Sequence, residues 1–110
     1  MKERKLHSID DVIVSMEHRF QADSSKNVKA KYQWLISGPS GKEFCVHVND
    51  GTFEVIHGRV DDPSVTFETD DNTYLRLVNN EIKAMTAILT RKLIVRGNIY
   101  LASKMDQIFK

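Results

Sequence analysis

Features that would assign this 110-residue chain to a broad protein class are scarce in its sequence. There is one cysteine, Cys45, and no run of apolar residues close to the roughly 20 that a membrane span requires. A single cysteine excludes an internal disulfide framework, so a reducing compartment is the simpler assumption. No apolar stretch of roughly 7–15 residues follows the charged start at residues 1–5, as a secretory signal peptide would require. We therefore expect a cytoplasmic protein.

An excess of charge of one sign is also missing. The 16 basic residues are balanced by 15 acidic ones, which argues against a nucleic-acid-binding protein, because that class needs a surplus of Lys and Arg. The apolar fraction of 41% is too high, and the net charge too low, for an intrinsically disordered chain. Since domains commonly have about 100–150 residues, we predict that residues 1–110 form a single domain.

The first structural signal is helical. Ser8 is a suitable N-cap, and Asp10 and Asp11 follow it in the first turn, where they face the positive end of the helix dipole. Apolar residues then recur at three- and four-residue spacing, as on one face of an amphipathic helix: Ile9, Val12, Ile13, Met16 and Phe20. The sequence predicts a helix here, followed by a polar connection over residues 21–27.

From residue 30 to residue 68 the apolar period changes to two, which is typical of strands with one buried face. The Asp50-Gly51 turn predicts a tight hairpin. Its register pairs residues 48 with 53 and 46 with 55 on the apolar face, and His47 with Glu54 on the opposite face. The earlier loop, residues 38–41, leaves the register of the preceding strand less simple. Pairing Trp34 with Val46 needs either a loop of odd length or a β-bulge, and we expect the bulge.

The remaining elements alternate between the two periods. We predict a strand at 65–68, followed by a short helix that Asp70 or Asp71 can cap and that carries Tyr74, Leu75 and Val78. A second helix covers residues 82–89, a strand follows at 93–97, and Asn98 caps a last helix that runs to residue 109. In the second of these helices the apolar stripe consists of Ile82, Met85, Ile88 and Leu89. One sheet face is then apolar and the helices can cover it: Tyr32, Trp34, Ile36, Phe44, Val46, Val48, Phe53, Val55, Val65, Phe67, Leu93 and Val95. This arrangement is a two-layer α+β domain.

Catalytic and metal-binding patterns are not visible. The segment 38–42 has some likeness to a phosphate-binding loop, but Glu43 stands where that motif needs Ser or Thr, and a strand follows it. The four histidines lack metal-ligand spacing. We interpret His47 with Glu54 as a solvated cross-strand pair, and Cys45 as a small packed apolar residue. We therefore expect no enzyme activity, no metal and no cofactor.

Four stretches together resemble the sterol carrier protein family, the non-specific lipid transfer proteins. They are residues 34–38 (WLISG), 46–51 (VHVNDG), 62–67 (DPSVTF) and 92–98 (KLIVRGN). The resemblance implies a five-stranded, mostly antiparallel sheet of order 3-2-1-4-5, covered on one face by helices that enclose an apolar tunnel. The chain differs from the family's usual small residues at Arg91 and Tyr100, which border the helices of that tunnel.

The resemblance implies non-catalytic binding or transfer of a lipid, such as a fatty acid, a fatty acyl-CoA, or a sterol-like or isoprenoid molecule. The predicted pocket combines sheet and helix residues: Trp34, Val46, Phe67, Leu75, Val78, Met85, Ile88, Leu89, Leu101, Met105 and Phe109. We interpret the basic residues at two places in the chain as scattered surface charge, and the alternative is weak, transient contact with an anionic membrane surface. They are Lys26, Lys29 and Lys31, then Arg91, Lys92 and Arg96.

A second hypothesis is an accessory domain that keeps the fold without a working pocket. Four apolar residues fall on the outer face of the predicted sheet, where a homodimer or a partner protein would pack: Leu35, Cys45, Ile56 and Ile94.

Overall fold

A sheet with helices on one face makes up the molecule. The computed structural model describes residues 5–110, so most of the charged start at residues 1–5 lies outside the described part. In chain order the elements are α1 (Ile9–Arg19), a 3₁₀ turn (Asp23–Ser25), β1 (Lys29–Ser37), β2 (Glu43–Asn49), β3 (Thr52–His57), β4 (Val65–Asp70), α2 (Asp71–Val78), α3 (Ala84–Leu89), β5 (Leu93–Gly97) and α4 (Ile99–Ile108).

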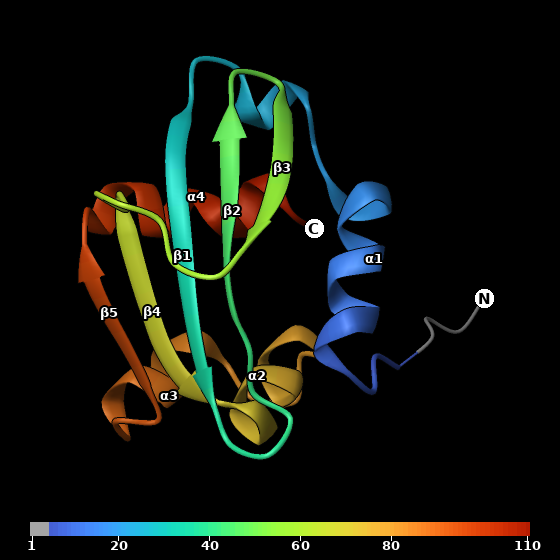
Figure 1. Ribbon diagram of the computed structural model, residues 1–110, viewed down its shortest axis with the longest axis vertical. Helices are drawn as coiled ribbons and strands as arrows, with labels where there is room; N and C mark the ends of the chain where they lie inside the picture. Colours follow the sequence, from blue (N-terminus) through green and yellow to red (C-terminus); the bar gives the residue numbers. More distant parts are fainter. Residues whose placement is uncertain (1–4) are drawn as a thin grey trace.

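The strand order is β3-β2-β1-β4-β5, as the family resemblance implies. Within residues 5–110, β1 and β4 are parallel, and the other three neighbouring pairs are antiparallel. Figure 1 shows α2, α3 and α4 behind the sheet, α1 beside β3, and the β3–β4 connection crossing in front. The predicted α+β fold class is therefore confirmed.

The β2–β3 hairpin has the predicted register. Val48 lies opposite Phe53, and His47 lies opposite Glu54. The turn residues Asp50 and Gly51 have φ angles of 45° and 87°. Positive φ at both central residues is what a tight hairpin turn requires, because it matches the twist of the two strands.

The predicted bulge between β1 and β2 is wrong. The ladder between these strands runs without interruption, and Trp34 lies opposite Phe44 instead of Val46. This register differs by two residues from the predicted one, so the same side chains still face the helices. A loop with an odd number of residues makes the shift possible: it turns at Gly38, which has a φ of 102°, and the Gly41 N–H donates to the Gly38 carbonyl.

The predicted helix ends are confirmed at three N-caps. Ser8 accepts a hydrogen bond from the Asp11 N–H, Asp70 accepts one from the Thr73 N–H, and Asn98 accepts one from the Leu101 N–H. In each case the side-chain oxygen satisfies an N–H group that the first helical turn leaves without a partner.

Helix α3 differs from the prediction. It has six residues, and Ala87, fully buried, is the residue that faces the core. Met85 and Leu89, predicted to pack inward, are 63% and 76% exposed. Helix α3 contacts β5, and a Schellman motif ends it: the Lys92 N–H donates to the Ala87 carbonyl and the Arg91 N–H donates to the Ile88 carbonyl. This backbone-defined end sets the orientation of the short helix, with Ala87 inward and Met85 and Leu89 outward.

The outer sheet face is partly covered by the connection between β3 and β4. The buried Gln33 side chain holds this connection in place: its amide N–H donates to the Gly58 carbonyl and its amide oxygen accepts from the Val60 N–H. Cys45 is fully buried on this face, and Ile56 is half-buried. Burial of Cys45 agrees with its interpretation as a packed apolar residue.

Candidate functional site

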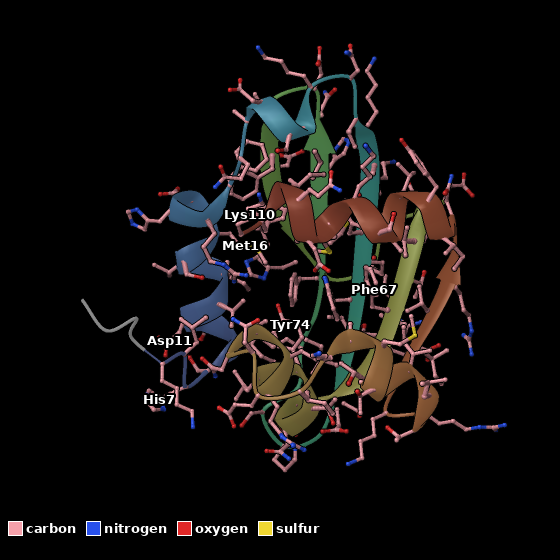
Figure 2. The ribbon with its side chains drawn as sticks, turned by 180° about the vertical axis from the view of Figure 1, so that it is seen from behind. His7, Asp11, Met16, Phe67, Tyr74 and Lys110 are labelled. Atoms are coloured by element: carbon pink, nitrogen blue, oxygen red, sulfur yellow. The ribbon has the colours of Figure 1, made fainter. Side chains whose placement is uncertain are left out.

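An aromatic cluster lies at the centre of the helix-covered face. The ring of Trp34 stacks on Phe67 with 4.3 Å between centroids, and the edge of Tyr74 from α2 meets it at 4.9 Å. Figure 2, seen from the helix side, shows Phe67 on the part of the sheet between α4 and the α2–α3 layer. β1 and β4 are neighbours in register here, because Trp34 pairs with Phe67. Parallel pairing of these two strands thus builds the cluster.

One polar atom in this apolar cluster lacks a partner. The indole nitrogen Nε1 of Trp34 is buried and makes no hydrogen bond with any of residues 5–110, and the residue as a whole is only 8% exposed. Buried donors of this kind almost always have a partner, and leaving one unpaired costs about 1–3 kcal/mol. The described residues therefore leave the hydrogen-bonding capacity of this nitrogen unused.

A second polar group ties the sheet to α4. The hydroxyl of Tyr32 donates to the Leu101 carbonyl at 2.7 Å. Burial of this side chain raises the pKa of Tyr32 to about 12, because the phenolate would be poorly solvated. The first turn of α4 is thereby fixed over β1 through a neutral hydroxyl.

The structure separates the eleven predicted pocket residues into groups. The sheet residues Trp34, Val46 and Phe67 are buried in the core. Four helix residues are half-buried and pack against that core: Leu75, Val78, Leu101 and Met105. The α3 residues Met85, Ile88 and Leu89 are exposed. The fold thus brings together the predicted residues of the sheet, of α2 and of α4. The predicted residues of α3 are not part of that group.

Phe109 is buried in the same core, but in a different aromatic group. It packs on Phe20 and Phe53, with ring centroids 5.5 and 5.2 Å away. This places Phe109 at the β3 end of the molecule, where it bridges to the residue that follows α1. It closes the core at that end of the sheet.

Arg91 and Tyr100, the two bulky departures from the family pattern, both lie at the surface. Tyr100 is 67% exposed, and its ring lies 5.2 Å from the Lys104 Nζ. Arg91 is exposed and has a φ of 61°, the left-handed conformation that ends α3. Neither side chain fills the space between the sheet and the helices.

A cleft of about 460 Å³ lies between α1 and the end of α2. Among the predicted residues it includes Val78, and its other lining residues are Lys5, Leu6, Ser15, Arg19, Asn79, Asn80, Glu81 and Lys110. The Asn79 side chain joins two of the lining segments, because its amide oxygen accepts from the Leu6 N–H and its amide N–H donates to the Leu6 carbonyl. Polar and charged residues line the cleft together with Leu6 and Val78, so its surface is of mixed polarity.

No local pattern in the sequence predicts this cleft. Its residues come from the start of the described chain, α1, the 78–81 segment and residue 110, which only the tertiary fold brings together. Within residues 5–110 no three His, Cys, Asp or Glu side chains are grouped as metal ligands would be. No helix in the same range is both long and apolar enough to cross a membrane.

Comparison with solved structures shows the same fold in proteins of low sequence identity. The chain is similar to the sec-alkylsulfatase Pisa1 from Pseudomonas sp., with a TM-score of 0.82 and 11% identity; the match covers 94% of this chain and 16% of that one. It is also similar to palmitated SCP2L2 from Aedes aegypti, with a TM-score of 0.75 and 20% identity over 93% and 94% of the two chains.

Sterol carrier protein 2 from Yarrowia lipolytica has a TM-score of 0.63 and 24% identity, covering 89% of this chain and 80% of its own. No curated protein matches the chain significantly in sequence. The family model described as the SCP-2 sterol transfer family, however, matches residues 15–110. The chain therefore belongs to the SCP-2 sterol transfer family, and this membership implies lipid binding.

Proposed function

We propose that this chain, as one domain spanning residues 1–110, binds a lipid between its sheet and helices and transfers it without catalysis. The observation that carries the proposal is the layer of half-buried aliphatic side chains that α2 and α4 place over the buried aromatic face of the sheet. Transfer of apolar surface out of water contributes about 0.8 kcal/mol per buried CH₂ group, so an acyl chain or a polycyclic body would supply the affinity.

The helix side of this interior is adaptable. Met105 and Leu101 of α4 and Leu75 and Val78 of α2 are half-buried, while the facing sheet residues are fully packed. Methionine is unbranched and polarisable, and it fits irregular apolar surfaces. A lipid would therefore enter by displacing the side chains of the helices. It would then occupy an apolar tunnel that has the sheet as one wall.

The unpaired Trp34 donor indicates what the ligand carries. An indole N–H in an apolar wall favours a molecule with an oxygen acceptor, such as a carboxyl, carbonyl or hydroxyl group, over a plain hydrocarbon. Fatty acids, acyl-CoA, sterols and oxygenated isoprenoids all meet this condition. A reducing compartment such as the cytoplasm suits the lone thiol of Cys45.

Native mass spectrometry before and after organic extraction tests the proposal. We expect the purified chain to carry a lipid mass that extraction removes, and a Met105→Asp variant to bind added palmitate at least tenfold more weakly. Ser103→Asp, two residues away on the exposed side of α4, is the matched control and should bind normally. Equal binding by Met105→Asp, with both variants folded by circular dichroism, would contradict the site.

A narrower experiment addresses Trp34. Trp34→Phe keeps the ring stack on Phe67 and removes the donor, so palmitate affinity should fall about two- to tenfold, the range of one net hydrogen bond. Affinity for a hydrocarbon of equal length should stay unchanged. An equal loss for both ligands would show that the ring, and not the donor, matters.

The second hypothesis, an accessory domain that pairs through its outer face, has a separate readout. Gln33 and the segment it holds cover part of that face, although Ile94 remains 43% exposed. Light scattering on the native chain and on Ile56→Glu would show a dimer that the substitution dissociates, if this surface joins two copies.

A further inference from the structure

Exposed apolar side chains gather at one edge of the sheet. Seven large apolar residues are exposed within residues 5–110, and five of them lie on α3 or the first turn of α4. We name these five the β5-edge patch: Met85, Ile88, Leu89, Ile99 and Tyr100. β5 is the edge strand that connects α3 to α4, and Figure 1 shows the two helices at its opposite ends. The patch therefore flanks a single edge of the molecule.

The charge of the same segment has one sign. Residues 82–105 contain five basic residues, Lys83, Arg91, Lys92, Arg96 and Lys104, and none of the chain's 15 acidic residues. The chain as a whole has a net charge of only +1, so this segment is the basic part of a protein that is acidic elsewhere.

Most of these cations are available for an external partner. Arg96 pairs with Glu68, but Lys83, Arg91, Lys92 and Lys104 have no carboxylate within ion-pair distance among the described residues. Lys104 instead lies over the ring of Tyr100, a member of the patch. Long apolar side chains surrounded by unpaired cations are the combination that inserts into the boundary of an anionic bilayer.

We propose that the β5-edge patch docks on the surface of an anionic phospholipid bilayer. The apolar side chains would enter the headgroup–acyl boundary, while Lys83, Arg91 and Lys104 contact lipid phosphates and carboxylates. The charge complementarity selects a bilayer with acidic lipids over a neutral one. This proposal rests on the proposed lipid-binding function. Because α3 and α4 both belong to the helix layer over the sheet, docking would bring the side through which the ligand enters to the membrane.

Vesicle co-sedimentation tests the apolar part. We expect the native chain to bind vesicles of equal parts phosphatidylserine and phosphatidylcholine, and to bind vesicles of phosphatidylcholine alone much more weakly. Leu89→Glu should reduce binding to the acidic vesicles about tenfold or more. Val14→Glu is the matched control, because Val14 is an apolar residue on α1 with 71% exposure, similar to Leu89. It should bind like the native chain.

The charge is tested in the same assay. Lys83→Gln and Arg91→Gln should each weaken binding about fivefold, in keeping with the contribution of one cation near an anionic surface. Lys110→Gln removes an exposed cation outside the segment and should change little. Rising salt should weaken the native chain and narrow the difference between these variants, because salt screens exposed charges.

Three outcomes would overturn the proposal. They are equal binding of the native chain to neutral and acidic vesicles, an equal loss for Val14→Glu and Leu89→Glu, and a dimer in light scattering that Leu89→Glu dissociates. A chain that binds acidic vesicles but never carries an extractable lipid would refute the proposed function and leave docking standing. A chain that carries an extractable lipid but does not bind acidic vesicles would refute the docking proposal alone.

Discussion

Helix α1 turns Ile9, Val12 and Met16 into the core, whereas helix α3 buries Ala87 and leaves Met85 and Leu89 in solvent. Both segments carry apolar residues at helical spacing. In α1 the other face carries charged residues, Asp10, Asp11 and Glu17 among them, so only one face can be buried without a desolvation cost. The residues of α3 include no charged side chain, and the pattern alone does not select a face.

The difference shows what decides the orientation of a short, wholly uncharged helix. α3 is held between the left-handed Asn80 before it and the left-handed Arg91 after it, and it lies close to β5. Ala87 is turned inward, whereas Ala84, equally small, and the larger Met85 and Leu89 are exposed, so side-chain size does not select the buried face. Backbone constraints, not the amount of apolar surface, set which face of α3 is buried.

The largest effect that tests this contrast comes from one substitution made in each helix. Met16→Ala should destabilise the protein by about 2–5 kcal/mol, because it leaves a cavity in the core. Met85→Ala should change the free energy of unfolding by less than about 0.5 kcal/mol, as surface substitutions do. Urea denaturation measures both. A similar loss of unfolding free energy in the two variants would mean that Met85 packs against a partner that is absent from the folded monomer.

Alkaline pH should weaken the covered region. The pKa of Tyr32 is raised from 10.0 to about 12 in the folded protein, so its stabilising effect is complete below pH 10 and is lost as pH rises through 12. The expected loss at pH 12 is on the order of 2 kcal/mol. Denaturant titrations of the native chain and Tyr32→Phe would measure it. An unchanged pH slope in Tyr32→Phe would assign the loss to another group, such as the buried Tyr74.

The helix starts offer the next contrast. Ser8 caps α1 with a side-chain hydrogen bond, while Lys83 at the start of α3 makes none. Ser8→Ala should therefore cost about 1 kcal/mol, and Lys83→Ser should stabilise by about 0.5–1 kcal/mol, because the backbone of residue 83 is already extended. Thermal unfolding compares the two. No gain in Lys83→Ser would indicate that α3 frays before the protein unfolds.

The smallest expected effect is at the end of α3. Arg91 adopts a φ of 61°, which costs a side-chain-bearing residue more than glycine. Arg91→Gly should relieve this strain, while the added freedom of the unfolded chain offsets part of the gain, for a net stabilisation of about 0.5 kcal/mol. Asn80→Gly, at a φ of 59°, is the control and should gain less, because asparagine tolerates this conformation.

Much of the sheet could be predicted from the sequence. The Asp50-Gly51 turn defined the register of β2 and β3, and strict alternation assigned the apolar face of every strand. The register of β1 against β2 could not be found in the same way, since two registers that differ by two residues place the same side chains on the same face. The geometry of the 37–41 loop chose between them.

The candidate site was predictable only in part. Its sheet wall, Trp34, Val46 and Phe67, follows from alternation, and Leu101 and Met105 follow from the period of α4. The orientation of α3 depends on a backbone contact that periodicity does not encode. No local pattern predicts that the Trp34 nitrogen is unpaired or that a cleft lies beside Arg19, because both depend on residues far away in the sequence.

The Gln33 side chain that fastens the β3–β4 connection has a practical consequence for Cys45. This thiol is the chain's sole cysteine, it is fully buried, and burial raises its pKa. Alkylating reagents need an accessible thiolate, so they react at this position only when the strands separate. The rate at which Cys45 is modified therefore reports how often the whole molecule opens, and no label needs to be added.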